Sequence, residues 1–139
     1  MKKNTLFVIL SWFWLSLVVL ASLVPKPKYY VRQMIKKILR MIGSADIDKN
    51  VHFIFYFLLV FFFVMAYKNT KWRAIIFVGA ILGSGIIELI QPIVSHSSRK
   101  CDINDLIYNI SGCILGLICA LASEFSFHYI QKLIKTKSI

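Results

Sequence analysis

Long runs of apolar residues alternate along this chain with short polar breaks. Four runs are prominent, at residues 6–24, 51–67, 74–94 and 103–122. Each is close to the roughly 20 residues that an α-helix needs to cross about 30 Å of hydrocarbon. The runs are continuously apolar, without the period-two alternation of barrel strands. The pattern predicts an all-α, polytopic integral membrane protein with four transmembrane helices.

A fifth helix is predicted between the first two runs, because apolar residues recur at helical spacing over residues 29–42. The apolar positions are Val31, Met34, Ile35, Ile38, Leu39 and Ile42. The opposite face carries Arg32, Lys36, Lys37 and Arg40. This arrangement is typical of an amphipathic helix that lies in the membrane interface, with Tyr29 and Tyr30 as anchors.

Composition supports this interpretation. Of the 139 residues, 58% are hydrophobic, so we expect one transmembrane domain over residues 1–139 and no separate soluble module. The net charge of +11 is spread over every loop. Dispersed basic residues suit contact with anionic lipid headgroups better than contact with nucleic acid. The three cysteines form no CxxC motif and predict no disulfide.

Charge also bears on orientation. Four spans place both termini and the 68–73 loop on one side, with eight Lys and Arg residues, against nine on the other side. The positive-inside rule gives most weight to short flanks and to the first helix. Lys2 and Lys3 precede the first helix, and three basic residues crowd the 68–73 loop. We therefore expect cytoplasmic termini.

The acidic residues are distributed very unevenly. Five of the six fall at helix ends that share the outer side in this topology: Asp46, Asp48, Glu88, Asp102 and Asp105. An ionisable group in the hydrocarbon costs about 2.5–3.5 kcal/mol on the insertion scale, which makes such residues functional candidates. We expect the sixth acid, Glu124, to pair with lysines of the carboxyl-terminal tail.

Polar residues near this side recur at helical spacing. His52 follows Asp48 by four residues, and Gln91 follows Glu88 by three. The fourth run and the residues just before it carry a stripe formed by Arg99, Asp102, Asp105, Asn109, Gly112 and Gly116. The Gly-x-x-x-Gly half of this stripe lets a neighbouring backbone approach closely. We expect the polar half to face the polar groups of the second and third helices.

Three interpretations of these polar residues remain open. In the first interpretation they are hydrogen-bonding groups that join helices, worth about 0.6 kcal/mol per pair. They also fit a site for zinc, manganese or magnesium, with His52, Glu88, Asp102 and Asp105 as ligands. The third interpretation, which we favour and which is compatible with a metal, is a site for the polar or phosphorylated headgroup of a lipid.

In the headgroup interpretation, each candidate residue has a role. His52, Glu88 and Asp105 are candidates for acid–base catalysis, while Lys49 and Arg99 would hold phosphate or carboxylate groups. The remaining polar residues would bind or orient the ligand: Asp48, Gln91, Asp102 and Asn109. The sequence has no P-loop, nucleophile elbow or Gly-x-Gly-x-x-Gly motif. Whether the protein is an enzyme, and its oligomeric state, stay open.

Three motifs together resemble the VanZ-like family of bacterial membrane proteins. They are Asp48-Lys49-x-x-His52, Glu88-x-x-Gln91 and Arg99-x-x-Asp102-x-x-Asp105-x-x-x-Asn109-x-x-Gly112. The resemblance covers residues 46–122 and implies a location in the bacterial cell membrane. The family's namesake is associated with reduced susceptibility to teicoplanin, a glycopeptide that acts on cell-wall precursors at the outer membrane surface. The resemblance thus implies a role in the cell envelope and antibiotic resistance, but no defined reaction.

Overall fold

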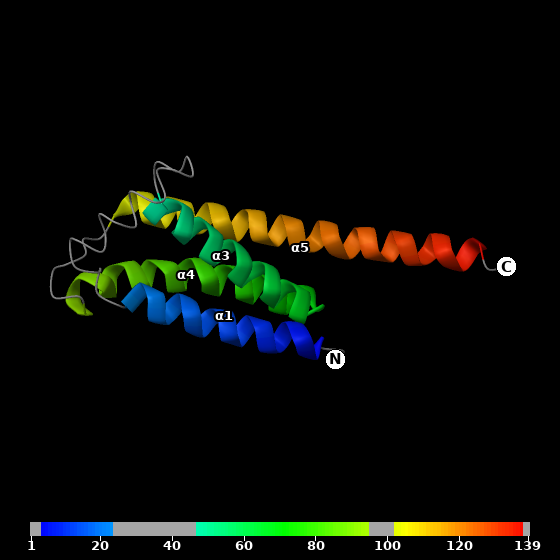
Figure 1. Ribbon diagram of the computed structural model, residues 1–139, viewed down its shortest axis with the longest axis horizontal. Helices are drawn as coiled ribbons and strands as arrows, with labels where there is room; N and C mark the ends of the chain where they lie inside the picture. Colours follow the sequence, from blue (N-terminus) through cyan, green and yellow to red (C-terminus); the bar gives the residue numbers. More distant parts are fainter. Residues whose placement is uncertain (1–3, 24–46, 95–101, 138–139) are drawn as a thin grey trace.

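The computed structural model describes residues 4–23, 47–94 and 102–137, and four long helices occupy nearly all of them. These are α1 (Thr5–Leu23), α3 (Ile47–Ala66), α4 (Thr70–Val94) and α5 (Ile103–Lys137). The helices run up and down in a bundle, so α1 and α4 begin at the end of the bundle where α3 finishes (Figure 1). Each helix is long and apolar enough to cross a membrane. The prediction of four helices long and apolar enough to cross a membrane is confirmed, while the predicted interfacial helix at 29–42 lies outside the described residues.

Helix α5 is longer than the sequence predicted. The apolar run was expected to end at residue 122, whereas the helix continues to Lys137. From residue 117 to the carboxyl terminus the chain contains neither Gly nor Pro, so nothing in the local sequence stops the helix. In Figure 1 the last part of α5 extends beyond the ends of the other three helices.

Helix α3 lies at the centre of the packing and makes its most extensive contacts with α5. Tyr56, Val60 and Val64 of α3 are buried together with Val18 of α1 and Cys113 of α5. Helix α1 is joined to α3 by a hydrogen bond that its Trp14 Nε1–H donates to the Phe55 carbonyl over 2.9 Å. The Trp14 and Phe55 rings also meet edge to face. The bundle core therefore forms around one face of α3.

The Gly-x-x-x-Gly motif of α5 explains how closely α5 approaches α3. A Cβ atom at Gly112 would overlap the carbonyl oxygen of Phe53, and one at Gly116 would overlap that of Phe57. Only glycine permits this separation, because the two backbones are in direct contact. The expectation of a close helix approach at this motif is confirmed, and the neighbouring backbone is that of α3.

The outer surfaces of the bundle are apolar. Large side chains such as Leu6, Phe13, Leu82 and Leu89 are more than half exposed. In water this surface would be unfavourable, whereas lipid chains solvate it well. The interior instead contains polar groups, including fully buried Ser11 and Ser84 and nearly buried Glu88. This distribution is that of a helical protein with a lipid-facing surface.

An ion pair marks the end of the bundle at which α1 begins. Arg73, near the start of α4, pairs with Glu124 of α5 and also donates from Nε to the Tyr67 carbonyl over 3.0 Å. The prediction that Glu124 pairs with tail lysines is wrong, because Glu124 forms its ion pair with Arg73 of α4. Nearby, the Tyr67 and Trp72 rings lie 6.3 Å apart. Aromatic residues beside charged ones are typical of a membrane–water boundary.

Candidate functional site

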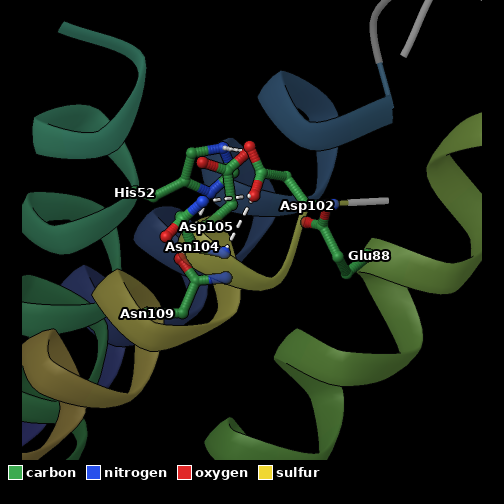
Figure 2. A network of polar contacts seen from close by, with 6 residues as sticks. All are labelled: His52, Glu88, Asp102, Asn104, Asp105 and Asn109. Carbon is green, nitrogen blue, oxygen red and sulfur yellow. Dashed lines mark hydrogen bonds and ion pairs between the residues drawn. The ribbon is translucent and has the colours of Figure 1, made fainter. Parts of the chain in front are cut away.

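At the opposite end of the bundle, His52 of α3 lies between two side chains of α5. Its Nδ1 atom is 3.2 Å from Asn109 Oδ1, and its Nε2 atom is 3.6 Å from Asp105 Oδ2. Asp105 and Asn109 are four residues apart and therefore share one helical face. Figure 2 shows the imidazole between them. The His52 and Asp105 side chains keep 16% and 17% of their surface exposed, so the pair can be reached from outside.

The surroundings of His52 suit either tautomer of its imidazole. With the Asn109 oxygen facing Nδ1, a proton on Nδ1 is donated to the amide. With the amide turned over, its nitrogen donates to Nδ1 and the ring proton lies on Nε2, which faces the Asp105 carboxylate at ion-pair distance. His52 therefore keeps its hydrogen bond to α5 in either tautomer, and its other ring nitrogen faces a carboxylate, an arrangement found in acid–base groups.

Glu88 joins α4 to the start of α5. Its Oε1 atom accepts the backbone N–H of Asp102 over 2.8 Å. Its Oε2 atom is buried and has no hydrogen-bond partner in the part of the chain that the structure describes, and the residue is only 2% exposed. Pro92, four residues later in α4, has no N–H to donate to the Glu88 carbonyl. Glu88 thus has a buried carboxylate oxygen that accepts no hydrogen bond from the described residues.

Asp102 has a structural role that the sequence interpretation missed. Its Oδ1 atom accepts the backbone N–H of Asn104 and the Asn104 side-chain amide, both over 2.9 Å. An aspartate immediately before a helix, bonded to the N–H two residues later, is an N-cap. The signal was present in the sequence, since Asp102 directly precedes an apolar helical run. One carboxylate oxygen of Asp102 therefore stabilises the start of α5.

We call these side chains the polar cluster: His52, Glu88, Asp102, Asp105 and Asn109 (Figure 2). Two buried polar groups of the same helices lack partners among the described residues. They are the Gln91 Nε2 group, one helical turn beyond Glu88, and the Tyr56 hydroxyl, one turn beyond His52. Lys49 lies about one helical turn before His52 in α3, and its Nζ atom is 6.0 Å from the centre of the Tyr108 ring.

The four residues proposed as metal ligands fall into two pairs. His52 contacts Asp105, and Glu88 contacts the backbone of Asp102. Within residues 4–23, 47–94 and 102–137, no three His, Cys, Asp or Glu side chains gather closely enough to hold a metal ion. The metal-binding interpretation therefore has no support in the described geometry.

The structure brings together most, but not all, of the predicted site residues. Arg99, Asp46 and the side chain of Asp48 lie outside the described part of the chain. Asn104 and Tyr108, which complete the contacts of Asp102 and Lys49, were not singled out from the sequence. Both are polar or aromatic residues in the first two turns of α5, and only the fold shows which helix they face.

A lipid-facing surface around four apolar helices, with a polar cluster at one end, defines a multi-pass helical membrane protein. A family model described as VanZ/LLP1 matches residues 4–125, which is most of the chain. The protein therefore belongs to the VanZ/LLP1 family. Comparisons with curated proteins and with solved structures gave no match.

Proposed function

We propose that the polar cluster binds the polar headgroup of an envelope lipid or cell-wall precursor at the outer face of the membrane. Through this binding, the protein lowers the susceptibility of the cell to glycopeptides such as teicoplanin. Membership of the VanZ/LLP1 family supports a role of this kind. The position of the cluster at one end of the bundle supports it further, because a headgroup lies at that depth.

The observation that carries the proposal is the state of Glu88. Its Oε2 atom is buried without a hydrogen-bond partner among the described residues. Leaving a buried polar group unpaired costs about 1–3 kcal/mol, and a charged group costs more. A ligand hydroxyl, amide or ammonium group that donates to Oε2 would offset this cost. Gln91 Nε2 and the Tyr56 hydroxyl, which also lack partners there, would add a donor and a group that both donates and accepts.

The cluster also has the chemistry for the charged part of a headgroup. Lys49 lies beside Tyr108 at the same end of the bundle, and we assign to Lys49 and Arg99 the role of holding phosphate or carboxylate oxygens. If the bound group is also modified, the pair formed by His52 and Asp105 is the candidate acid–base system. Binding is the core of the proposal, and turnover is a further step that needs its own assay.

A second candidate function is a non-enzymatic scaffold or partner-binding module in which the polar residues only join helices. The contacts between His52 and Asn109 and between Glu88 and Asp102 favour it, since each connects two helices. This function does not account for the atoms of Glu88, Gln91 and Tyr56 that lack partners among the described residues, because polar groups that serve only to join helices gain nothing from remaining unpaired.

Two substitutions separate these functions when tested in a teicoplanin-susceptible bacterium that produces the protein. His52→Ala removes the group between Asp105 and Asn109, and Glu88→Gln keeps an oxygen for the Asp102 N–H while replacing Oε2 with a donor. His128→Ala is the matched control, because His128 is an exposed histidine near the far end of α5. We expect normal membrane levels but lost tolerance for the first two variants, and wild-type tolerance for the control. Loss of the protein itself from the membrane would favour the scaffold.

A further inference from the structure

The last part of α5, residues 125–136, has an apolar face that nothing in the described structure covers. Six large apolar side chains there are at least 47% exposed: Phe125, Phe127, Tyr129, Ile130, Leu133 and Ile134. In Figure 1 this segment projects past the rest of the bundle. An exposed apolar surface of this density requires a partner or a membrane.

The position of the membrane boundary along α5 follows from its polar ends. From Asp102 to Glu124, 22 residues of helix span about 33 Å, close to the thickness of the hydrocarbon layer. The ion pair between Arg73 and Glu124 therefore lies at one boundary. Residue 136 is a further 18 Å or so along the helix axis. If the helix simply continued along the membrane normal, Leu133 and Ile134 would be in water.

The segment is amphipathic, and its charged residues are all basic. Tyr129, Ile130, Leu133 and Ile134 share one face at helical spacing, while His128, Lys132 and Lys135 form a stripe on the other. No acidic residue follows Glu124. An amphipathic helix with aromatic and aliphatic residues opposite lysines is typical of a helix that lies in a membrane interface.

We propose that residues 125–136 lie along the membrane surface and bind anionic lipid headgroups through Lys132 and Lys135. The apolar face then enters the acyl boundary, and the lysines meet negative charge. In the structure α5 is one continuous helix over Ile103–Lys137, so this orientation requires α5 to bend near Ser123. The Ser123 hydroxyl donates to the Cys119 carbonyl four residues earlier over 2.8 Å, and such bonds favour helix bending. The proposal requires Glu124 to lie at a boundary, and it does not depend on which side that is or on the function of the polar cluster.

Charge distinguishes a lipid surface from a second copy of the chain. Two copies in one membrane have the same orientation, so a pair of these segments would place lysines at equal heights, where they repel. An anionic surface attracts them instead. Each lysine near such a surface raises the ratio of membrane-bound to free segment roughly fivefold. The tether at Glu124 also keeps the segment close to lipid at high effective concentration.

Photo-crosslinking of the full chain in lipid nanodiscs tests the proposal. A benzophenone amino acid replaces Leu133 on the apolar face or, as the matched control, Gln131 on the polar face. We expect a lipid adduct at 133 that exceeds the adduct at 131, and that increases when phosphatidylglycerol is mixed into phosphatidylcholine. Adding Lys132→Gln and Lys135→Gln should remove that increase, lowering the bound-to-free ratio up to about thirtyfold.

Other outcomes overturn the proposal. A crosslinked dimer in place of the lipid adduct would show that a second copy covers the face. Equal lipid adducts at 131 and 133, or a yield at 133 that is independent of phosphatidylglycerol, would show that the segment does not lie on an anionic surface as described. The same labelled protein in bacterial membranes reports whether another protein covers the face, which would be seen as an adduct of higher mass.

Discussion

The carboxylate of Glu88, in α4, accepts the backbone N–H of Asp102, the residue that caps α5, over 2.8 Å. The two oxygens of Glu88 therefore differ. Oε1 satisfies a helix N-terminus, where the helix dipole favours negative charge. Oε2 is buried with no partner among the described residues. One side chain thus combines a structural bond with an acceptor that a ligand can use.

This difference predicts that two substitutions at Glu88 affect the stability of the protein differently. Glu88→Gln keeps an acceptor for the Asp102 N–H and removes a buried carboxylate, so the thermal stability in detergent should be no lower than that of the wild type. Glu88→Ala leaves the N–H unpaired and should lower the free energy of unfolding by about 1–3 kcal/mol. Thermal unfolding of both purified variants measures this. Equal stability of Glu88→Ala and the wild type would contradict the capping role.

The contact between Gly112 and Phe53 predicts a severe packing defect. Gly112→Ala places a methyl group against the Phe53 carbonyl oxygen, so α5 must move away from α3. We expect a loss of at least about 1–3 kcal/mol, as in other overpacked interiors, and reduced accumulation in the membrane. Gly79→Ala is the matched control, because a Cβ added there has no atom of the described residues within 4 Å apart from the backbone of its own helix and its chain neighbours. The stability of this control should equal or exceed that of the wild type, since alanine favours helix more than glycine.

The helix-packing interpretation fails if both glycine variants behave alike. Denaturant titration in mixed micelles, followed by circular dichroism, provides the comparison. A defect at Gly79 but not at Gly112 would mean that the α3–α5 contact is not the one described.

The pairing of Arg73 with Glu124 predicts energetic coupling between the start of α4 and α5. Both side chains are mostly buried, with 14% and 21% of their surface exposed. We expect Arg73→Gln and Glu124→Gln each to destabilise the protein, by about 1.5–3 kcal/mol for a charged hydrogen bond. The double variant should lose clearly less than the sum of the two. A double-mutant cycle on unfolding free energies measures the coupling, and strict additivity would show that the pair contributes nothing.

Orientation has a direct chemical test in Cys101, which directly precedes Asp102 in the sequence. Cytoplasmic termini predict that a membrane-impermeant thiol reagent labels Cys101 in intact cells. Cys113 is fully buried and serves as an internal control that should not react. Peptide mapping by mass spectrometry identifies the labelled cysteine. Labelling of Cys101 only after lysis would place the cluster on the cytoplasmic side.

Much of the fold was predictable because lipid imposes simple rules. Four helices follow from the apolar runs, and the approach of α5 to another helix follows from Gly112 and Gly116. The end of α5 was not predictable from hydropathy, since Phe127, Ile130 and Leu133 continue the helix after polar Ser123 and Glu124. Average apolarity falls there, whereas helix propensity does not.

For the site, the sequence predicted only which residues gather at one end of the bundle. Spacing placed Asp105 and Asn109 on one face of α5, and the structure confirms that both reach His52. The cap formed by Asp102 is a local bond that its position directly before an apolar run indicates, although the sequence interpretation missed it. Spacing could not show that Arg73 instead of a tail lysine meets Glu124. That pairing depends on how helices rotate and cross, which is determined by packing against distant residues.

The central claim, that the polar cluster binds a headgroup, is tested most directly by mass spectrometry of lipid that copurifies with the protein. The wild type and His128→Ala should retain one class of envelope lipid or cell-wall precursor under mild detergent. His52→Ala and Glu88→Gln, purified as folded protein, should retain at least tenfold less of it, as expected when about 1.4 kcal/mol of binding free energy is lost. Equal retention by all four proteins, or no specific lipid on the wild type, would contradict the account.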